Sequence, residues 1–256
     1  MRVTTAVFAL CCASLPTAAL ADSDDWVGAY AGVNLGYSFG ASQSRTSTVF
    51  ASPGYFASTS VPAIAAVGND HLSPDGFVGG GQVGYNFAFG PNFVAGLEAD
   101  FEANSISDKE AATGTYPCCA PSSFTVGSKI DSSWLFTLRP VLGYAWDSWM
   151  IYGTGGLALH DQKASFVFTD NFANALSTGG FSTTKGTWTA GGGIQGKIDT
   201  NWSWRVEYLY IDYGHMGGTS TNLVAGSPAV AFPQNSFTQF ASFTGNVVRF
   251  AVNYRF

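Results

Sequence analysis

Apolar side chains recur at every second position along eight separate segments of the chain. A period of two places successive side chains on opposite faces of a β-strand, so each segment has one apolar face and one polar face. This alternation predicts an all-β protein. The segments are residues 26–40, 77–89, 93–103, 133–146, 149–160, 187–198, 202–212 and 245–256.

The composition excludes several other classes of protein. Only 11% of the 256 residues are charged, whereas soluble domains average about 25%. Disordered chains combine high charge with few aromatic residues, but here 15% of the residues are aromatic. A membrane helix needs about 20 consecutive apolar residues, and no such run occurs after the first 21 positions. The chain is therefore not expected to be a soluble enzyme, a disordered protein or a helical membrane protein.

The first 21 residues have the pattern of a secretory signal peptide. Arg2 precedes an apolar run over residues 3–15, and Ala19 and Ala21 form an A-x-A cleavage site. We expect cleavage after Ala21, which leaves residues 22–256 as one domain. That domain has ten basic and seventeen acidic residues, a net charge of −7. This balance does not favour nucleic-acid binding, which requires a basic surface.

The charged side chains of the eight segments share the face opposite the aromatic residues, apart from Asp212 at a segment end. A charge facing lipid costs about 2–4 kcal/mol at the bilayer midplane, so this arrangement predicts lipid on the aromatic face and a charged lumen. Aromatic residues also gather near the segment ends, as in the girdles of membrane barrels. A soluble sandwich or lipocalin-like barrel is the alternative fold. The charged residues are Glu98, Asp100, Glu102, Arg139, Lys197, Arg205, Glu207, Arg249 and Arg255.

Connections between the segments alternate in length. Three are tight turns of turn-forming residues, at positions 90–92, 147–148 and 199–201. The other four have roughly 25–35 residues, far above the usual median of about 4–6. Short periplasmic turns and long extracellular loops are typical of outer-membrane barrels, and lipid does not tolerate open sheet edges. We therefore predict an eight-stranded antiparallel transmembrane β-barrel with both termini in the periplasm.

The end of the chain resembles the C-terminal assembly signal of bacterial outer-membrane proteins, through Phe250, Val252, Tyr254 and Phe256. Four further stretches, in order, resemble the small porin-like outer-membrane β-barrel proteins of alphaproteobacteria, the immunogenic surface-protein type. The resemblance implies an OmpA/OmpX-like fold in the outer membrane. It also implies contact with lipid and lipopolysaccharide and with the barrel assembly machinery. The stretches are Trp26–Tyr37, Gly143–Trp146, Tyr152–Ala158 and Asn201–Tyr210.

The charged face of the strands predicts an ion-pair network inside the barrel. Glu98, Asp100 and Glu102 could instead hold a metal ion, since hard cations take oxygen ligands. A buried carboxylate without a partner is costly, however, and several arginines lie on the same face. We expect no metal site and no cofactor. The predicted network comprises Glu98, Asp100, Glu102, Arg139, Arg205, Glu207, Arg249 and Arg255.

Residues with chemical reactivity are few. The histidines are His71, His160 and His215, and although Asp161 and Ser165 follow His160, no recognisable nucleophile motif accompanies them. We therefore expect no enzymatic activity. Adjacent Cys118 and Cys119 could form a strained vicinal disulfide or pair with thiols elsewhere.

Three classes of function remain at this stage. The chain could be a surface structural protein with a filled lumen, a small porin for passive diffusion, or a module whose loops bind a host molecule or a ligand such as haem. Eight strands leave an interior just wide enough for side chains to fill. The sequence therefore favours the structural role.

Overall fold

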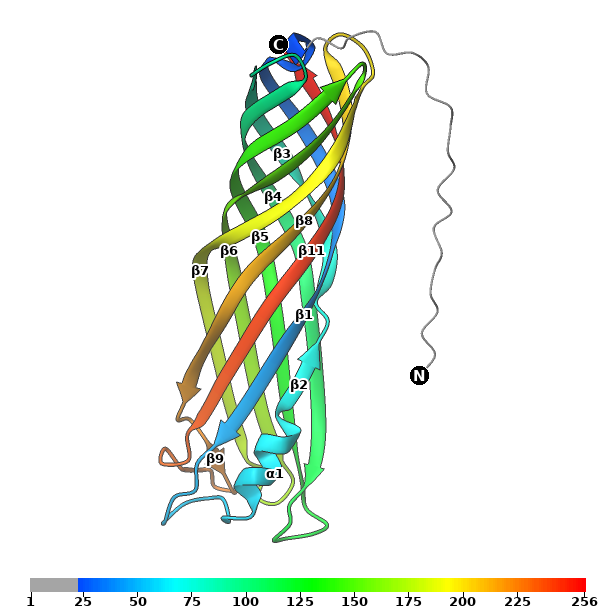
Figure 1. The fold of residues 1–256 in the computed structure, drawn as a ribbon. Coiled ribbons are helices and arrows are strands. Elements are labelled where there is room, and N and C mark those ends of the chain that lie inside the picture. Colours follow the sequence, from blue (N-terminus) through cyan, green and yellow to red (C-terminus); the bar gives the residue numbers. More distant parts are fainter. Residues whose placement is uncertain (1–22) are drawn as a thin grey trace.

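A computed structural model describes residues 23–256, and the predicted signal peptide with Ala19 and Ala21 lies outside these described residues. Eleven β-strands form one sheet, with a short 3-10 helix before it and one α-helix within a connection (Figure 1). The elements are η1 (Ser23–Trp26), β1 (Gly28–Thr48), α1 (Ser60–Val67), β2 (Asn69–Leu72), β3 (Asp75–Ala88), β4 (Phe93–Thr115), β5 (Ser123–Trp146), β6 (Trp149–Asp170), β7 (Leu176–Lys197), β8 (Trp202–Ser220), β9 (Val224–Ala225), β10 (Val230–Ala231) and β11 (Phe237–Arg255).

Eight long strands pair in a closed ring. The order is β1-β3-β4-β5-β6-β7-β8-β11, and β11 pairs back onto β1 from Tyr30↔Arg255 to Thr48↔Phe237. Every pairing is antiparallel. The first and last long strands thus lie side by side, and the three tight turns sit at one end of the ring with the C-terminus (Figure 1). Connections 49–74, 116–122, 171–175 and 221–236 lie at the other end, the loop end.

The predicted count of eight strands omits three short ones. β2 pairs with β1, whereas β9 pairs with β10 and touches β7 through Leu176↔Val224. These strands have two to four residues. A period of two is not detectable over so few positions, which is why the sequence pattern did not reveal them.

The long strands also extend further than predicted, and two of the loops are much shorter. β4 continues to Thr115 instead of residue 103, and β5 begins at Ser123 instead of residue 133. Their connection is therefore only residues 116–122. The extensions carry small and polar side chains on the outer face, such as Thr113 and Thr125, whose hydroxyls are 2.9 Å apart. Without outward apolar residues, these parts resembled loops in sequence.

Register shifts explain where the predicted segments stop, including one between Ala103 and Ile106 where β4 pairs with β5. Pairing of β5 shifts register between Asp131 and Leu135, and pairing of β8 skips Tyr213. A bulge inserts one extra residue and exchanges the two faces of the strand beyond it. In β5 the buried residues are odd-numbered after the bulge, like Leu135, and even-numbered before it, like Ile130. The alternation in sequence is interrupted at the same positions.

The apolar face of each long strand near the tight turns is the exposed one. Val33 is 67% exposed and Phe77 is 68% exposed, and comparable residues on all eight strands form a continuous ring that we call the belt. An exposed apolar area of this extent is far larger than a monomeric soluble protein normally shows. Representative belt residues are Val33, Phe77, Leu97, Leu142, Ile151, Trp188, Tyr208 and Phe250.

Helix α1 lies at the loop end, where Ile64 is fully buried. Across residues 23–256, no helix has the length and apolar character needed to cross a membrane.

The ring is not fully hydrogen-bonded between β7 and β8. These strands pair only from Lys197↔Ser203 to Thr189↔Ile211, although β6 pairs with β7 as far as Leu176 and β11 pairs with β8 as far as Ser220. We call the unpaired stretch, residues 179–187 facing 213–219, the β7–β8 split. It begins at the bulge that turns Tyr213 inward onto Phe243, with ring centroids 4.3 Å apart.

Side chains bridge the β7–β8 split, where the strands form no backbone hydrogen bonds to each other. Trp188 Nε1 donates to Asp212 Oδ2 over 3.1 Å, and Lys185 Nζ donates to the carbonyl of His215. The Phe181 ring fills the space beside Gly218, where a Cβ would lie 2.0 Å from it. The outer mouth of the split is a surface hollow lined by residues of both strands, including Phe181, Lys185 and His215.

The β7–β8 split predicts a local loss of amide protection. Amides of 179–187 that point toward β8 should exchange with solvent much faster than those of 189–197, because they lack a ladder partner. Residues 164–169 of β6 are paired on both sides at the same height and provide the control. Hydrogen–deuterium exchange read by NMR would measure this, and uniform protection along β7 would contradict the split.

Candidate functional site

Seven charged side chains meet inside the ring. β4 contributes Glu98, Asp100 and Glu102, β5 contributes Arg139, β8 contributes Arg205 and Glu207, and β11 contributes Arg249. The strand register places Glu98 directly opposite Arg139, and Glu207 directly opposite Arg249. Every one of the seven is at most 2% exposed. We call this group the lumen network.

Each arginine of the lumen network contacts more than one carboxylate or polar partner. Arg139 Nη2 lies 2.8 Å from Glu98 Oε1 and 2.7 Å from Asp100 Oδ2, and its Nη1 lies 3.2 Å from Glu207 Oε1. Arg249 Nη2 lies 2.5 Å from Glu207 Oε2, and its Nη1 contacts Glu102. Arg205 Nη1 lies 2.5 Å from Glu98 Oε2. Charge-assisted contacts of this kind are roughly twice as strong as neutral hydrogen bonds.

Two tyrosines complete the lumen network. The Tyr30 hydroxyl donates to Glu98 Oε2 over 2.6 Å, and the Tyr152 hydroxyl donates to Glu207 Oε1 over 2.8 Å. The Arg205 guanidinium lies 5.7 Å from the ring centroid of Tyr30 and 5.0 Å from that of Tyr152. Neither tyrosine was among the residues predicted for the network. Tyr30 could have been found, because it lies on the polar face of its own segment.

Glycines make room for these two rings. A Cβ at Gly84 would lie 2.5 Å from the Tyr30 ring, and one at Gly193 would lie 2.6 Å from the Tyr152 hydroxyl. Both glycines face the lumen on strands beside the tyrosines. Larger residues at these positions would displace the hydroxyls that satisfy Glu98 and Glu207.

Arg255 was predicted in the lumen network, and the structure places it elsewhere. Its Nη2 donates to the carbonyl of Thr200 over 2.7 Å, at the end with the tight turns. Arg255 shares the inward parity of Arg249 but is six residues further along β11, a separation of about 20 Å. Whether a residue number is odd or even determines on which face of the strand the side chain lies, but not how far along the strand it is. Lys197, also at this end, lies 2.7 Å from Asp25.

Apolar layers enclose the lumen network on both sides. The layer toward the tight turns contains Trp26, Val94, Val141, Ala145, Met150 and Tyr152. The layer toward the loop end contains Val78, Ile106, Leu135, Ala158, Leu209, Ile211, Tyr213, Phe243 and Val247. The charges are thus removed from water, and their mutual contacts must offset the desolvation.

The lumen network has four carboxylates and three guanidinium groups, and its carboxylates are not equally used. Glu98 contacts Arg139, Arg205 and Tyr30, whereas Glu102 contacts Arg249 and leaves Oε2 without a hydrogen bond. Within residues 23–256, no group of His, Cys, Asp and Glu side chains is arranged as a metal site. The geometry is that of an ion-pair cluster.

His160, Asp161 and Ser165, which lie close together in sequence, are not arranged as a catalytic group. His160 Nε2 lies 3.2 Å from Thr187 Oγ1, and its ring packs against Tyr213. Asp161 Oδ1 accepts the backbone N–H groups of Ser133 and Trp134 at 2.7 and 2.9 Å. Among the side-chain hydrogen bonds of the described residues, the carboxylate of Asp161 binds Ser133 and Trp134, and the His160 ring contacts Thr187.

The loop end has an aromatic interior of its own. Inward side chains from β5, β6 and β11 pack there against α1 and the connection before it. Phe56 lies edge-on to Phe168 and to Phe237, with centroids 5.6 and 5.7 Å apart. The residues of this cluster are Phe56, Ile64, Tyr116, Phe124, Val126, Phe166, Phe168, Ala175, Leu223, Ala225 and Phe237.

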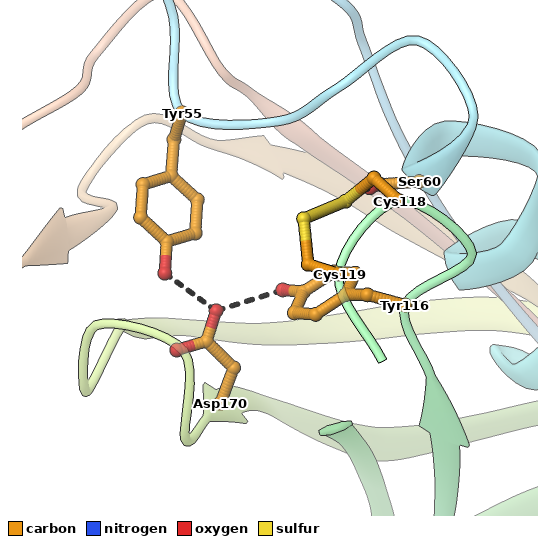
Figure 2. The surroundings of a disulfide bond; sticks show 6 residues. All are labelled: Tyr55, Ser60, Tyr116, Cys118, Cys119 and Asp170. Carbon is orange, nitrogen blue, oxygen red and sulfur yellow. Dashed lines mark hydrogen bonds between the residues drawn. A yellow bond between two sulfur atoms is a disulfide. The ribbon is translucent and has the colours of Figure 1, made fainter. Parts of the chain in front are cut away.

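Cys118 and Cys119 form a disulfide at the rim of that interior (Figure 2). The sequence had left their redox state open. Beside the disulfide, the hydroxyls of Tyr55 and Tyr116 both donate to Asp170 Oδ2, over 2.6 and 2.8 Å. Burial raises the pKa of each tyrosine hydroxyl well above its usual value, and the bond to Asp170 raises the pKa further. Both hydroxyls therefore remain protonated donors.

Substitutions of different carboxylates in the lumen network should lower the free energy of unfolding by different amounts. Glu98→Ala should lower the free energy of unfolding by about 3–5 kcal/mol, because two buried guanidinium groups lose partners. Glu102→Gln should cost less, since Glu102 uses one oxygen and Arg249 keeps other partners. Urea unfolding in detergent micelles, followed by tryptophan fluorescence, would measure both. A wild-type unfolding midpoint for Glu98→Ala would contradict the stabilising role of the network.

The whole chain is similar to known outer-membrane proteins. Residues 5–256 match the family model described as outer membrane protein beta-barrel domain. The 31 kDa outer-membrane immunogenic protein of Brucella melitensis is 34% identical over 244 residues, which are 95% of this chain and 89% of the relative. The 22 kDa outer membrane protein of Rhizobium leguminosarum is 29% identical over 61% of this chain and 62% of the relative.

Similarity to solved structures is more distant. The outer membrane protease OmpT from Escherichia coli has a TM-score of 0.44 and 10% identity, with 90% of this chain and 97% of the protease covered. Neisserial surface protein A has a TM-score of 0.39 and 13% identity, with the same coverage. Similarity at this level assigns no activity to the chain. The family match and the Brucella relative, which both span nearly the whole chain, show that it belongs to the alphaproteobacterial outer-membrane β-barrel family.

Proposed function

We propose that the chain is a structural outer-membrane barrel that does not conduct solutes and presents its loop end outside the cell. The observation that carries this proposal is the lumen network. Seven charged side chains from four strands fill one level of the interior, and apolar layers cover that level on both sides. Larger barrels of 16–18 strands leave an aqueous channel, whereas the interior of an eight-stranded barrel is just wide enough for side chains, or one small ligand, to fill.

The belt and the strand lengths support a barrel that projects from the membrane. A membrane-spanning strand needs about 9–11 residues, but β4 has 23 and β6 has 22. Belt residues occupy the half of the long strands near the tight turns and, in the shorter β3, almost the whole strand from Phe77 to Phe87. We propose that this half spans the bilayer, with the turns and both termini in the periplasm, and that the other half stands outside.

Lysines just beyond the belt suggest contact with lipopolysaccharide. The side chains of Lys129 and Lys163 are 45% and 57% exposed on the outer faces of β5 and β6. If the proposed orientation holds, these ammonium groups lie at the level of the anionic head groups of the outer leaflet. We propose lipopolysaccharide as the lipid partner at this level.

The C-terminal residues fit the role of an assembly signal. Phe250 and Phe256 are exposed on the outward face of β11, and Phe256 N–H donates to the carbonyl of Ala29 over 3.0 Å. Tyr254 lies between Trp202 and Phe256, with ring centroids 5.1 and 5.3 Å away. We propose that Phe250, Val252, Tyr254 and Phe256 are read by the barrel assembly machinery.

Passive diffusion and ligand binding, the two alternative functions, are not equally supported by the structure. Passive diffusion would require a continuous water path, yet the interior space beside Ile130 and Met216 is about 20 Å³, enough for about one water molecule. A ligand-binding role has one specific observation in its favour, the pocket beside the disulfide. Haem is not the ligand that we propose. The described residues lining that pocket include no histidine or methionine, its two cysteines are joined in a disulfide, and both tyrosine hydroxyls donate to Asp170, so no side chain is free to act as an axial ligand.

A filled lumen predicts no stable conductance. The folded protein reconstituted into planar bilayers should give no reproducible single-channel steps, because the lumen network and its apolar layers block the axis. Reconstitution would be verified by heat-modifiable migration of the same sample on a gel. Channels of reproducible size would make the filled-lumen proposal wrong and favour the porin alternative.

The proposed orientation predicts a selective pattern of proteolysis on intact cells. The loops 49–74, 116–122, 171–175 and 221–236 contain no lysine or arginine, so trypsin should leave them intact. Chymotrypsin should cleave within 49–74 and 171–175, since Phe50 and Phe172 are 56% and 54% exposed. Mass spectrometry of the fragments would identify the sites. Chymotrypsin cleavage that appears only after the outer membrane is permeabilised would contradict an extracellular loop end.

A further inference from the structure

A pocket of about 220 Å³ opens at the loop end beside the disulfide (Figure 2). Four aromatic rings line it, from three connections that are far apart in sequence. The loop after β1 provides Tyr55 and Phe56, the loop after β4 provides Tyr116, and the loop after β6 provides Phe172. The Cys118–Cys119 disulfide forms another part of the wall.

The ring of Phe172 stands at a steep angle to two of the other rings. Phe172 is 6.4 Å from Tyr55 and 6.4 Å from Tyr116 between ring centroids, with interplanar angles of 70° and 75°. Phe172 is also 54% exposed, an unusual state for a phenylalanine beside buried aromatic residues. The rings thus form a partly open box in which π faces are available to a small guest.

A carboxylate lies behind the aromatic wall of the pocket, in contact with two of its lining residues. Asp170 accepts the hydroxyls of Tyr55 and Tyr116 through Oδ2, and the N–H groups of Ala173 and Ala175 through Oδ1. None of the ion pairs among the described residues involves Asp170, and the surrounding loops contain no lysine or arginine. A phenol that donates to a carboxylate has a more electron-rich ring, which strengthens its attraction for a cation.

The pocket offers few groups for other kinds of ligand. The Ser60 hydroxyl is 3.6 Å from Cys118 Sγ, and the Ser60 N–H donates to the carbonyl of Ala57. The hydroxyls of Tyr55 and Tyr116 are occupied by Asp170. A sugar or an anion needs several convergent hydrogen-bond donors, whereas a methylated ammonium group needs π faces and negative charge.

We propose that this pocket binds a methylated ammonium group, with Tyr55, Tyr116 and Phe172 as the aromatic box and Asp170 as the anion that polarises it. The group could be a free small cation or the head group of a choline lipid. Access from outside the cell rests on the proposed orientation of the loop end. Binding by the purified protein does not, so the two proposals can fail separately.

The test is calorimetric titration of the folded protein in a non-ionic detergent. Choline should bind about tenfold more tightly than 3,3-dimethylbutan-1-ol, its neutral isostere, because only the cation gains from the π faces. Equal affinity for the two would overturn the proposal in favour of a neutral apolar site. No detectable binding of choline at millimolar concentration would also overturn it.

Substitutions test whether choline binds in the aromatic box. Phe172→Leu keeps an apolar side chain at an exposed position and should weaken choline binding severalfold, with little effect on the alcohol. Phe240→Leu alters an exposed aromatic residue of β11 outside the pocket and should leave choline binding unchanged. Heat-modifiable migration would confirm that both variants fold. Equal losses in the two variants, or none in Phe172→Leu, would place the binding elsewhere.

A second titration separates the two sources of the group. Glycerophosphocholine carries the lipid head group without acyl chains. If it binds at least as tightly as choline, the site accommodates a lipid head group. If only choline binds, the site takes a free cation.

Discussion

The burial of four carboxylates among three guanidinium groups is the constraint on which the rest of the barrel depends. Glu98 faces Arg139 across β4 and β5, and Glu207 faces Arg249 across β8 and β11. A slip of one residue in either pair would move charges to the outer face, where each costs about 2–4 kcal/mol in lipid. The charged lumen therefore specifies the strand register as well as which face is inside.

The two halves of the barrel are built with opposite polarity. In the half that carries the belt, apolar side chains point outward and the lumen network points inward. In the half at the loop end, Phe124, Phe166 and Phe168 point inward and small or polar residues such as Thr113 point outward. Proteins place apolar groups away from water and charge away from lipid. In the proposed orientation, the change in polarity along the same strands matches a change from lipid to water, with the bulge in β5 exchanging its faces between the halves.

Alternation predicted the long strands, their faces and all seven members of the lumen network, together with one residue that lies elsewhere. It placed Arg255 in the network because alternation identifies the face of a strand but not the position along it. It missed the strand extensions although a signal was present, since Phe124, Val126 and Ile130 occupy alternate positions. In this extension of β5 the apolar residues face inward, whereas those of the belt face outward. The bulge lies between the two parts of the strand. The β7–β8 split, the cysteine pairing and the aromatic box depend on contacts between distant segments, which local patterns do not encode.

The position of the β7–β8 split also follows from the membrane. Unpaired backbone groups within the hydrocarbon region cost several kcal/mol each, so a spanning sheet must be closed there. At the height of the lumen network β7 and β8 are fully paired, through Gln195↔Arg205 and Gly193↔Glu207. Pairing ends at Thr189↔Ile211, one residue short of Trp188 at the edge of the belt. In the proposed orientation, water is available to the unpaired N–H and C=O groups beyond this point. The barrel is thus closed where lipid requires closure and is open only in the half that we propose to lie outside the membrane.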